Sequence, residues 1–538
     1  MSSTHAILHA VHREWTGFRR PGRLIALAAA ALTVIVLGLL YAFGNHTSCD
    51  GPCPGAVTGP DGSLVNDQFS FLHQDLGENG SITVRMTSMT GTITYPPPHH
   101  DRIVPGLVPW AKAGIIIKDG VRQGSSYAAL MVTGSHGVRM QYDYRHDIAG
   151  SGGGVSARSP RWLRLTRSGD TVTGHESADG ERWTEVGTAR LPGLPGTVQV
   201  GLFATSPGDL TLRPAGLGGA TEQVRWTQAG GVFDHVDVEG ATAAAGRHGD
   251  LVGEANRTDW ERKYQASGAV EKNGVITVTG SGDIGPTGAE NGARPVERTL
   301  GGLAFALLVV LVVAARLTTS AFRREATGGV PVTRAELAAK AVVLAAVTFV
   351  TGLLAVGVTV PVGAAILKGN GIPVHGVSAL TGARVVVGTA AVLALSAVLA
   401  LALGALLRRA WAAVAVAVLT VALPYAAAST PLFPDDVSEW LLRVTPAAGF
   451  ATQQTLVAYP QVVAHYAPST GYFPLPWWAG AGVLGVYAAV LLGLALRRRP
   501  ESPVPHCPPE SPVPHCPPEG AALHRPPEGV ARPSASPR

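Results

Sequence analysis

Charged residues are scarce in this sequence of 538 residues: Asp, Glu, Lys and Arg together make up 15%, whereas 46% of the residues are hydrophobic. A typical soluble protein is about 25% charged, so the composition argues against a wholly soluble enzyme. Aromatic residues are also few, at 6%, but Gly (66) and Pro (40) are abundant. This balance fits thin apolar helices joined to loop-rich β structure, and it excludes disorder of the whole chain.

Other absences narrow the function further. Four cysteines are too few for a disulfide scaffold. The net charge of +5 comes from Arg residues that flank apolar runs rather than interleave with aromatic residues, so no nucleic-acid partner is predicted. The phosphate-binding motif G-x-x-x-x-G-K-[ST] does not occur, so a role driven by ATP would need a separate ATPase polypeptide. The apolar runs lack the series of Asp, Glu or His residues that a proton relay requires.

Six apolar runs are long enough to cross a membrane. The hydrocarbon core of a bilayer is about 30 Å thick, which a helix of roughly 20 residues spans. The runs cover residues 24–43, 300–322, 341–362, 385–407, 410–428 and 476–496. The first run follows an amphipathic, basic head (residues 1–23) that is too extended for a cleaved signal peptide, and we interpret it as an uncleaved anchor. Pro424 interrupts the fifth run, which is the weakest.

The basic residues beside these runs predict the orientation of the chain, because Lys and Arg in short flanks resist translocation. With a cytoplasmic N-terminus, six crossings place every strong basic cluster on the cytoplasmic side. The clusters lie in residues 13–23, 316–340, 408–409 and 497–499. We therefore expect a multi-pass protein of the cell membrane with both termini cytoplasmic, residues 44–299 outside the cytoplasm, and a membrane domain over residues 300–499.

The insert between the first two runs has the periodicity of β structure. Apolar and polar residues alternate with a period of two, and Gly, Asp, Asn and Pro separate the short runs, which predicts an all-β sandwich. WAKAGIIIKD (110–119) and the segment 162–186 resemble the concanavalin-like jelly-roll domains found outside bacterial cells. The resemblance implies an extracytoplasmic jelly roll over about residues 66–240. Residues 240–298 add a further sheet element or form a stalk that returns to the membrane.

Some sandwiches bind sugars through exposed aromatic side chains. Trp110, Tyr142 and Tyr144 are candidates for such a glycan-binding platform. Trp162 and Trp183 stand in strand patterns, and we expect both in the core.

Metal ligation and hydrolysis find little support in the insert. His and Asp residues occur at positions 99–101, 136 and 146–147, but their spacing matches no set of metal ligands. The acidic residues of 176–185 crowd one hairpin, whereas a glycosidase needs two carboxylates facing each other across a cleft. We therefore predict neither a metal site nor catalytic residues.

Two short segments outside these domains have distinct compositions. Cys49 and Cys53 flank three turn-favouring residues just after the first apolar run, and we predict a disulfide between them, with two free thiols as the alternative. Residues 500–538 repeat a Pro-rich unit that cannot form a helix or a central strand. We predict that this tail is disordered and cytoplasmic.

The layout of the membrane half resembles the six-helix permeases of ATP-binding-cassette exporters, the ABC-2 type. The resemblance rests on the head HREWTGFR (12–19), the connection 318–340, LGALLRR (403–409), LRVTPAA (442–448) and the final RRR (497–499). It implies a transport subunit with no cofactor of its own, a separate ATPase that binds ATP, and a second permease copy or subunit. Such permeases often have an acidic, an aromatic and a basic residue followed by Gly after the second helix, but this chain has AFRRE (321–325).

Only the head and the connection between the second and third runs offer short cytoplasmic helices that could contact an ATPase. The residues that we consider as coupling candidates are Glu14, Arg19, Arg323, Arg324, Glu325, Arg334 and Glu336. Arg323 and Arg324, which adjoin the second apolar run, are equally consistent with anchoring helix ends inside the cell. A different class of function is an anchored surface receptor or adhesion protein, in which the sandwich binds a glycan. One anchor helix would suffice for that role, so five further spans weigh against it.

Overall fold

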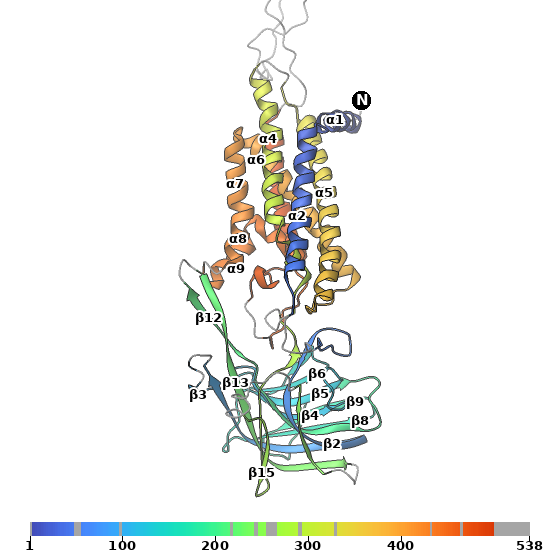
Figure 1. Cartoon of the computed structure of the whole chain (residues 1–538), viewed down its shortest axis with the longest axis vertical. Coiled ribbons are helices and arrows are strands. Elements are labelled where there is room, and N and C mark those ends of the chain that lie inside the picture. The colour runs from blue at the N-terminus through green and yellow to red at the C-terminus, as the bar shows by residue number, and fades with distance from the viewer. Residues whose placement is uncertain are drawn as a thin grey trace, which may run out of the picture.

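The computed structural model describes residues 3–47, 55–95, 99, 101–215, 219–241, 246–253, 266–288, 293–327, 331–430, 433–462 and 466–499. It has two parts arranged end to end, a bundle of helices and a mostly β domain (Figure 1). The chain enters the β domain after the first long helix and leaves it before the second. Both parts and their order along the chain agree with the expectation from the sequence.

Six helices among the described residues are long and apolar enough to cross a membrane. They are α2 (Pro21–Gly44), α4 (Leu303–Ala326), α5 (Arg334–Gly369), α6 (Ala379–Leu407), the continuous run of α7 (Ala410–Ala417), η4 (Val418–Ala422) and α8 (Leu423–Ser429), and α10 (Trp477–Arg497). The prediction of six long apolar helices is confirmed. Helix α5 begins earlier than predicted because Thr333 and Glu336 form a capping box at its start.

The centre of the bundle is formed by α6 and α4. In their most apolar segments, 72% of the residues of α6 and 56% of those of α4 are buried, compared with 22% for α2 and α10. Small residues allow the close contacts: a Cβ on Gly352 of α5 would lie 2.8 Å from the Cα of Ala390 in α6. In a membrane, such close packing of small residues replaces the hydrophobic driving force that is absent between helices in lipid.

The fifth helix accommodates Pro424 through a local change of geometry. The π-helical turn η4 lies directly before α8, in which Pro424 is one of the first two residues. Because proline lacks an N–H and its ring crowds the preceding turn, an added residue in that turn relieves the clash. The turn between α6 and this helix is short. Arg408, with φ 56°, ends α6 in the left-handed conformation, and α7 begins two residues later.

Shorter helices lie at both ends of the bundle. Helix α1 (Ser3–Phe18) crosses the bundle axis at the end away from the β domain (Figure 1). The other end has η3 (Val296–Leu300), the amphipathic helix α9 (Asp435–Val444), η5 (Pro446–Gln453) and η6 (Pro468–Thr470). These short helices connect the long ones on the side of the β domain.

The β domain is built around one long strand, β2 (Phe69–Thr94), within a sheet of 15 strands among the described residues. The path β10-β9-β8-β2-β11-β4-β5-β6-β7 is antiparallel throughout, and β1 pairs separately with β17. The other strands are β1 (Val65–Asp67), β3 (Ile103–Pro105), β4 (Lys112–Lys118), β5 (Tyr127–Thr133), β6 (Val138–Tyr142), β7 (His146–Ala149), β8 (Arg161–Ser168), β9 (Thr171–Ser177), β10 (Thr184–Arg190), β11 (Val198–Thr205), β12 (Asp209–Ala215), β13 (Gly219–Ala241), β14 (His248–Val252), β15 (Gly268–Lys272), β16 (Val275–Gly280) and β17 (Ile284–Pro286).

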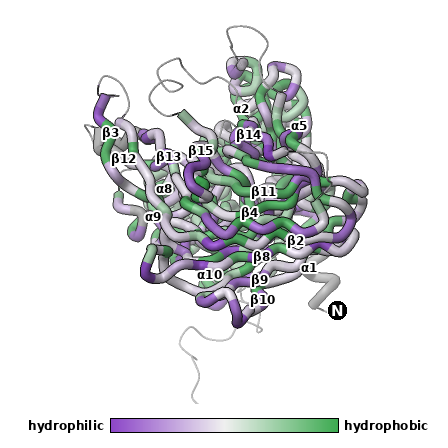
Figure 2. The backbone as a smooth tube through the Cα atoms, turned by 90° about the horizontal axis from the view of Figure 1, so that it is seen from below, coloured by the Kyte–Doolittle hydropathy of each residue, from purple (hydrophilic) through white to green (hydrophobic). Residues whose placement is uncertain are grey.

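Two apolar clusters lie on opposite faces of β4 and β5. The larger contains Ile115 and Leu130, and the smaller contains Ile116 and Met131. Every residue of β4 and β5 is buried as a result. Seen from the side of the β domain, the central strands β4 and β11 are largely apolar, whereas polar residues are frequent around β8, β9 and β10 (Figure 2).

The β domain extends beyond the predicted boundary at residue 240. Strand β16 pairs with β13 and β15, and β17 pairs with β1 at the start of the domain. The alternative left open by the sequence is thereby decided: these residues supply sheet elements up to Pro286. The domain therefore begins and ends on the paired strands β1 and β17, which bring its two connections to the bundle close together.

A buried ion pair lies within the smaller cluster. The Lys118 ammonium group donates hydrogen bonds to Asp67 (2.8 Å), to the Ser125 carbonyl (3.0 Å) and to the Tyr144 hydroxyl (3.0 Å). Both members of the pair are fully buried. Burial lowers the pKa of Lys118, while the Asp67 carboxylate opposes this shift. The pair connects β1 to β4 and so fixes the first strand of the domain.

We expect Asp67→Ala to lower the free energy of unfolding by about 3–5 kcal/mol, because it leaves the Lys118 charge buried and unpaired. Arg247→Ala breaks the more exposed ion pair to Glu271 and should cost at most about 1 kcal/mol. Urea unfolding of the purified chain in detergent, followed by tryptophan fluorescence, measures both effects. Equal effects of the two substitutions would contradict a structural role of the buried pair.

Candidate functional sites at the two ends of the bundle

The inner end of the bundle, which is the end away from the β domain, holds α1 against α5. Buried Lys340 of α5 donates a hydrogen bond to Glu14 of α1. Arg13 lies 4.0 Å from Glu336 in the first turn of α5. A carboxylate and an ammonium group 326 positions apart in the sequence thus fix the orientation of the head helix.

A second group of contacts joins the end of α10 to α4 and α5. Arg499 donates to Glu325 at 3.3 Å, and its guanidinium carbon lies 3.9 Å from the centre of the Phe322 ring. Its backbone carbonyl accepts a hydrogen bond from Arg334 at 2.8 Å. The last residues described after α10 are therefore bound to the connection between the second and third long helices.

The coupling candidates from the sequence fall into two sets. Glu14, Glu325 and Glu336 take part in contacts within the chain. Exposed basic side chains at this end include Arg13, Arg19, Arg20, Arg323, Arg324, Arg334, Arg408, Arg409, Arg497 and Arg498. Sequence reasoning missed Lys340 and Arg499 as partners of the acidic residues. Their only signal was a charge beside an apolar run, which is typical of any helix end.

At the outer end of the bundle, which faces the β domain, hydrogen bonds join the segments that connect the helices to one another and to the β domain. We call this set of contacts the ring. Asn370, after α5, donates from its side chain to the carbonyls of Ala42 and Asn45, both at 3.0 Å. Arg294, before α4, forms a parallel bridge with Val374. The chain entering the β domain and the chain leaving it are thus both bound to the connection between α5 and α6.

Glu297 is the buried acidic residue of this ring. It accepts hydrogen bonds from Thr455, at 2.7 Å from the hydroxyl and 3.2 Å from the backbone N–H. Burial raises the pKa of Glu297 to about 7, against the opposing effects of Thr455 and Arg384. Arg384 in turn donates to the carbonyl of Gln454. Glu297 and Arg384 therefore bind neighbouring residues of the same outer loop.

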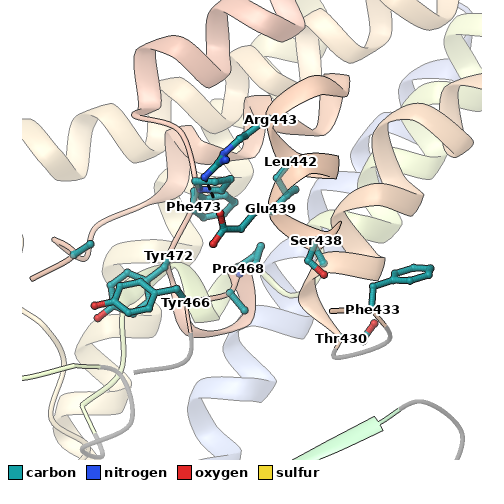
Figure 3. Close-up of a pocket in the computed structure, with 14 residues that line it drawn as sticks. Thr430, Phe433, Ser438, Glu439, Leu442, Arg443, Tyr466, Pro468, Tyr472 and Phe473 are labelled. Atoms are coloured by element: carbon teal, nitrogen blue, oxygen red, sulfur yellow. Dashed lines mark hydrogen bonds and ion pairs between the residues drawn. The ribbon is translucent and has the colours of Figure 1, made fainter. Parts of the chain in front are cut away.

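A cavity of about 150 Å³ opens beside this ring, between the end of α8, helix α9 and the loop that leads to α10 (Figure 3). Its lining is mixed, with aromatic rings, an ion pair and the hydroxyl groups of Thr430, Ser438, Tyr466 and Tyr472. The lining residues are Ala428, Thr430, Phe433, Ser438, Glu439, Leu442, Arg443, Ala458, Tyr466, Ala467, Pro468, Tyr472, Phe473 and Pro474. Glu439 and Arg443 form a pair at 2.7 Å one helical turn apart.

The proposed glycan platform does not form. Trp110 and Tyr144 are buried, with 5% and 1% exposure, so neither ring is available on the surface. Tyr142 is half-buried and stacks on His146 with 4.3 Å between ring centres. The three residues do not form a shared exposed surface.

The prediction that Trp162 and Trp183 belong to the core is wrong. Both are half-exposed, and the guanidinium groups of Arg85 and Arg164 lie over their respective rings. The alternation of β8 explains the position of Trp162, because the buried residues Leu163 and Leu165 require Trp162 to face the other side. Trp183 lies directly before β10, outside the strand pattern.

The predictions for the disulfide, the tail and the possible metal ligands concern residues that the structure describes only in part. Cys49 and Cys53 lie outside the described residues, as does the tail from residue 500 onward. Asp147 pairs with Arg139, and His136 stacks on Trp110 with 4.0 Å between ring centres. Within the part of the chain that the structure describes, no three His, Cys, Asp or Glu side chains gather in a way that could hold a metal ion.

Comparisons with known proteins give little further information. No family model and no curated protein matches the sequence. Among solved structures, scytalido-glutamic peptidase is similar with a TM-score of 0.26 and 7% identity, covering 40% of this chain and 98% of that one. A functionally unknown protein from Saccharomyces cerevisiae has a TM-score of 0.19 and 16% identity, covering 38% and 99%. A GH43 protein, BlXynB from Bacillus licheniformis, has a TM-score of 0.16 and 13% identity, covering 28% and 27%.

We predict that Glu297→Gln flattens the pH dependence of stability. The folded chain retains the Glu297 proton up to about pH 7, whereas the unfolded chain releases it near 4.5. The stability that this group contributes is therefore complete below pH 4.5 and is lost as the pH rises through 7. Thermal unfolding in detergent between these values should show a steeper decline for the natural chain than for Glu297→Gln. The exposed Glu239→Gln serves as the control, and identical profiles of all three proteins would contradict the prediction.

Proposed function

We propose that this chain is the transmembrane permease subunit of an ABC transporter of the exporter type implied by the family resemblance, driven by a separate ATPase. The observation that carries the proposal is the internal packing of the bundle, in which α6 and α4 are largely enclosed by other helices. A membrane anchor needs one helix and no buried centre. The head helix fixed on α5 by Glu14 and Lys340 supports a bundle with defined inner contacts.

The proposed arrangement in the cell follows from the distribution of charge. Within the bundle, most of the exposed basic side chains lie at the inner end, which we assign to the cytoplasm because Lys and Arg in short flanks resist translocation. The β domain, which we interpret as a jelly roll, then lies outside the cytoplasm. One six-helix subunit would form half of a transport pathway, so a second copy or a second permease subunit completes it. The chain itself holds no cofactor in this proposal.

The second candidate function is recognition of an extracellular glycan by the β domain. It is favoured by a groove of about 800 Å³ on β2, β8 and β13, which Trp162 and Arg164 line together with polar side chains. Aromatic and polar side chains on an open surface suit sugar recognition. Glycan recognition would be compatible with transport. As the sole function of the chain, it would leave the packed helical bundle without a role of its own.

We expect the partner ATPase to bind the exposed basic residues of the connection. Arg323→Glu with Arg324→Glu should reduce co-purification of an ATPase in mild detergent several-fold, because a reversed charge repels the acidic groups that such a surface attracts. The control reverses two exposed charges of the β domain, Arg190→Glu with Lys272→Glu. Glu325 and Glu336 are less suitable targets, since both bond within the chain.

Failure to recover any ATPase with the intact natural chain would overturn the proposed function. Unchanged recovery with Arg323→Glu and Arg324→Glu, but reduced recovery with variants of the head, would place the contact on α1 instead.

Cysteine labelling of intact cells tests the proposed orientation. In a background with all native cysteines replaced by serine, Lys368→Cys and Val457→Cys should react with a reagent that does not cross membranes, because both sites are exposed at the outer end. Arg324→Cys and Arg408→Cys should react only after the membrane is made permeable. Labelling of Arg408→Cys in intact cells would exclude the six-span orientation.

A further inference from the structure

The outer cavity, defined by the lining residues given above, has one wall of aromatic rings. Tyr466 and Tyr472 lie with 4.6 Å between their ring centres, and Phe473 follows directly in the chain (Figure 3). The faces of such rings carry partial negative charge and attract cations, more strongly where water is partly excluded. This wall alone would accept a neutral aromatic compound or an organic cation.

The opposite wall distinguishes between these ligands. It is formed by α9, from which Glu439 and Leu442 line the cavity. Among the described residues that line the cavity, Glu439 is the only acidic one, and its side chain is about 37% exposed. A carboxylate and aromatic rings that line the same cavity favour a positive charge in the space between them and disfavour an anion.

Arg443 forms an ion pair with the Glu439 carboxylate, but this pair is not the only contact of Arg443. Its guanidinium carbon lies 5.8 Å from the centre of the Trp440 ring, and its side chain is about 39% exposed. The long Arg side chain can therefore keep its contact with Trp440 and with water while Glu439 accepts another cation. A ligand cation would replace one half-exposed ion pair with another and would not leave a buried charge unpaired.

The size and place of the cavity limit the ligand further. An apolar cavity of about 150 Å³ holds a molecule the size of benzene, so one ring or a short alkyl group with an attached ammonium group matches the space. Exposed apolar side chains lie at and beside the cavity: Phe433, which lines it, is 48% exposed, and Trp440, next to Glu439 in α9, is 60% exposed. Such a boundary of apolar and polar groups concentrates amphiphilic molecules.

We propose that the outer cavity binds a small organic cation that has an apolar body, such as a quaternary or protonated amine. The aromatic wall of Tyr466 and Tyr472 holds the apolar body, and the Glu439 carboxylate binds the charged group. Arg443 competes with the ligand for Glu439 and so sets its affinity. This site is additional to the proposed transport function, because binding requires neither an ATPase nor a second subunit.

Isothermal titration of the purified full-length chain in detergent tests the proposal with benzyltrimethylammonium as the probe. Benzenesulfonate, an anion with the same ring, and tert-butylbenzene, which is neutral, serve as controls. We expect saturable binding of the cation and at least about tenfold weaker binding of both controls. Equal binding of the cation and the anion, or no saturable binding of the cation at millimolar concentration, would overturn the proposal.

Variants of three residues locate the site. Glu439→Gln keeps the shape of the side chain and should weaken cation binding at least about tenfold, whereas Arg443→Gln should strengthen it by removing the competitor. Leu442→Trp fills the cavity and should abolish binding, while Val437→Trp on the exposed face of α9 is its matched control. If Arg443→Gln weakens binding or Glu439→Gln leaves it unchanged, the proposed contacts are wrong, and the isosteric Glu439→Gln decides the result even if Leu442→Trp misfolds.

Discussion

The arrangement of the molecule depends on the way in which a large β domain is attached between two helices of a bundle. Two chain segments must pass between the parts, and each would be a flexible linker if nothing held it. The structure binds both to the connection between α5 and α6, through Asn370 on one side and the bridge of Arg294 with Val374 on the other. Glu297 adds a third contact through Thr455 of the next outer loop. The outer end therefore behaves as one hydrogen-bonded layer to which the helices and the β domain both connect.

The acidic residues of the inner end show how a basic surface is left exposed. Glu14, Glu325 and Glu336 each have a partner or a capping role within the chain. Internal pairing removes them from the surface potential, while most of the Arg residues around them remain exposed. A pairing that stabilises the bundle thus also determines the sign of charge that a partner or lipid headgroup meets. A partner that binds the connection between α4 and α5 therefore meets its basic residues rather than its acidic ones.

The two ends of the bundle differ in the chemistry that they present. The inner end is basic and its acidic groups are paired, whereas the outer end combines aromatic rings, Glu439 and a cavity lined by α9 and the loop before α10. Between them, α6 is surrounded by helices whose small residues permit close approach. Strand β12 rises from the β domain toward α9 (Figure 1).

The sequence by itself determined the six long apolar helices and the β character of the insert, because run length and residue periodicity are local properties. It also contained the orientation of Trp162: Leu163 and Leu165 share one face of β8, so the alternation places Trp162 on the other. Only the tertiary structure decided which residues meet across the chain. Glu14 with Lys340 and Glu297 with Thr455 are separated by 326 and 158 positions, and no local pattern relates them. The burial of Trp110, the extension of the β domain to Pro286 and the outer cavity likewise follow from strand pairing and helix packing, which depend on contacts between distant segments.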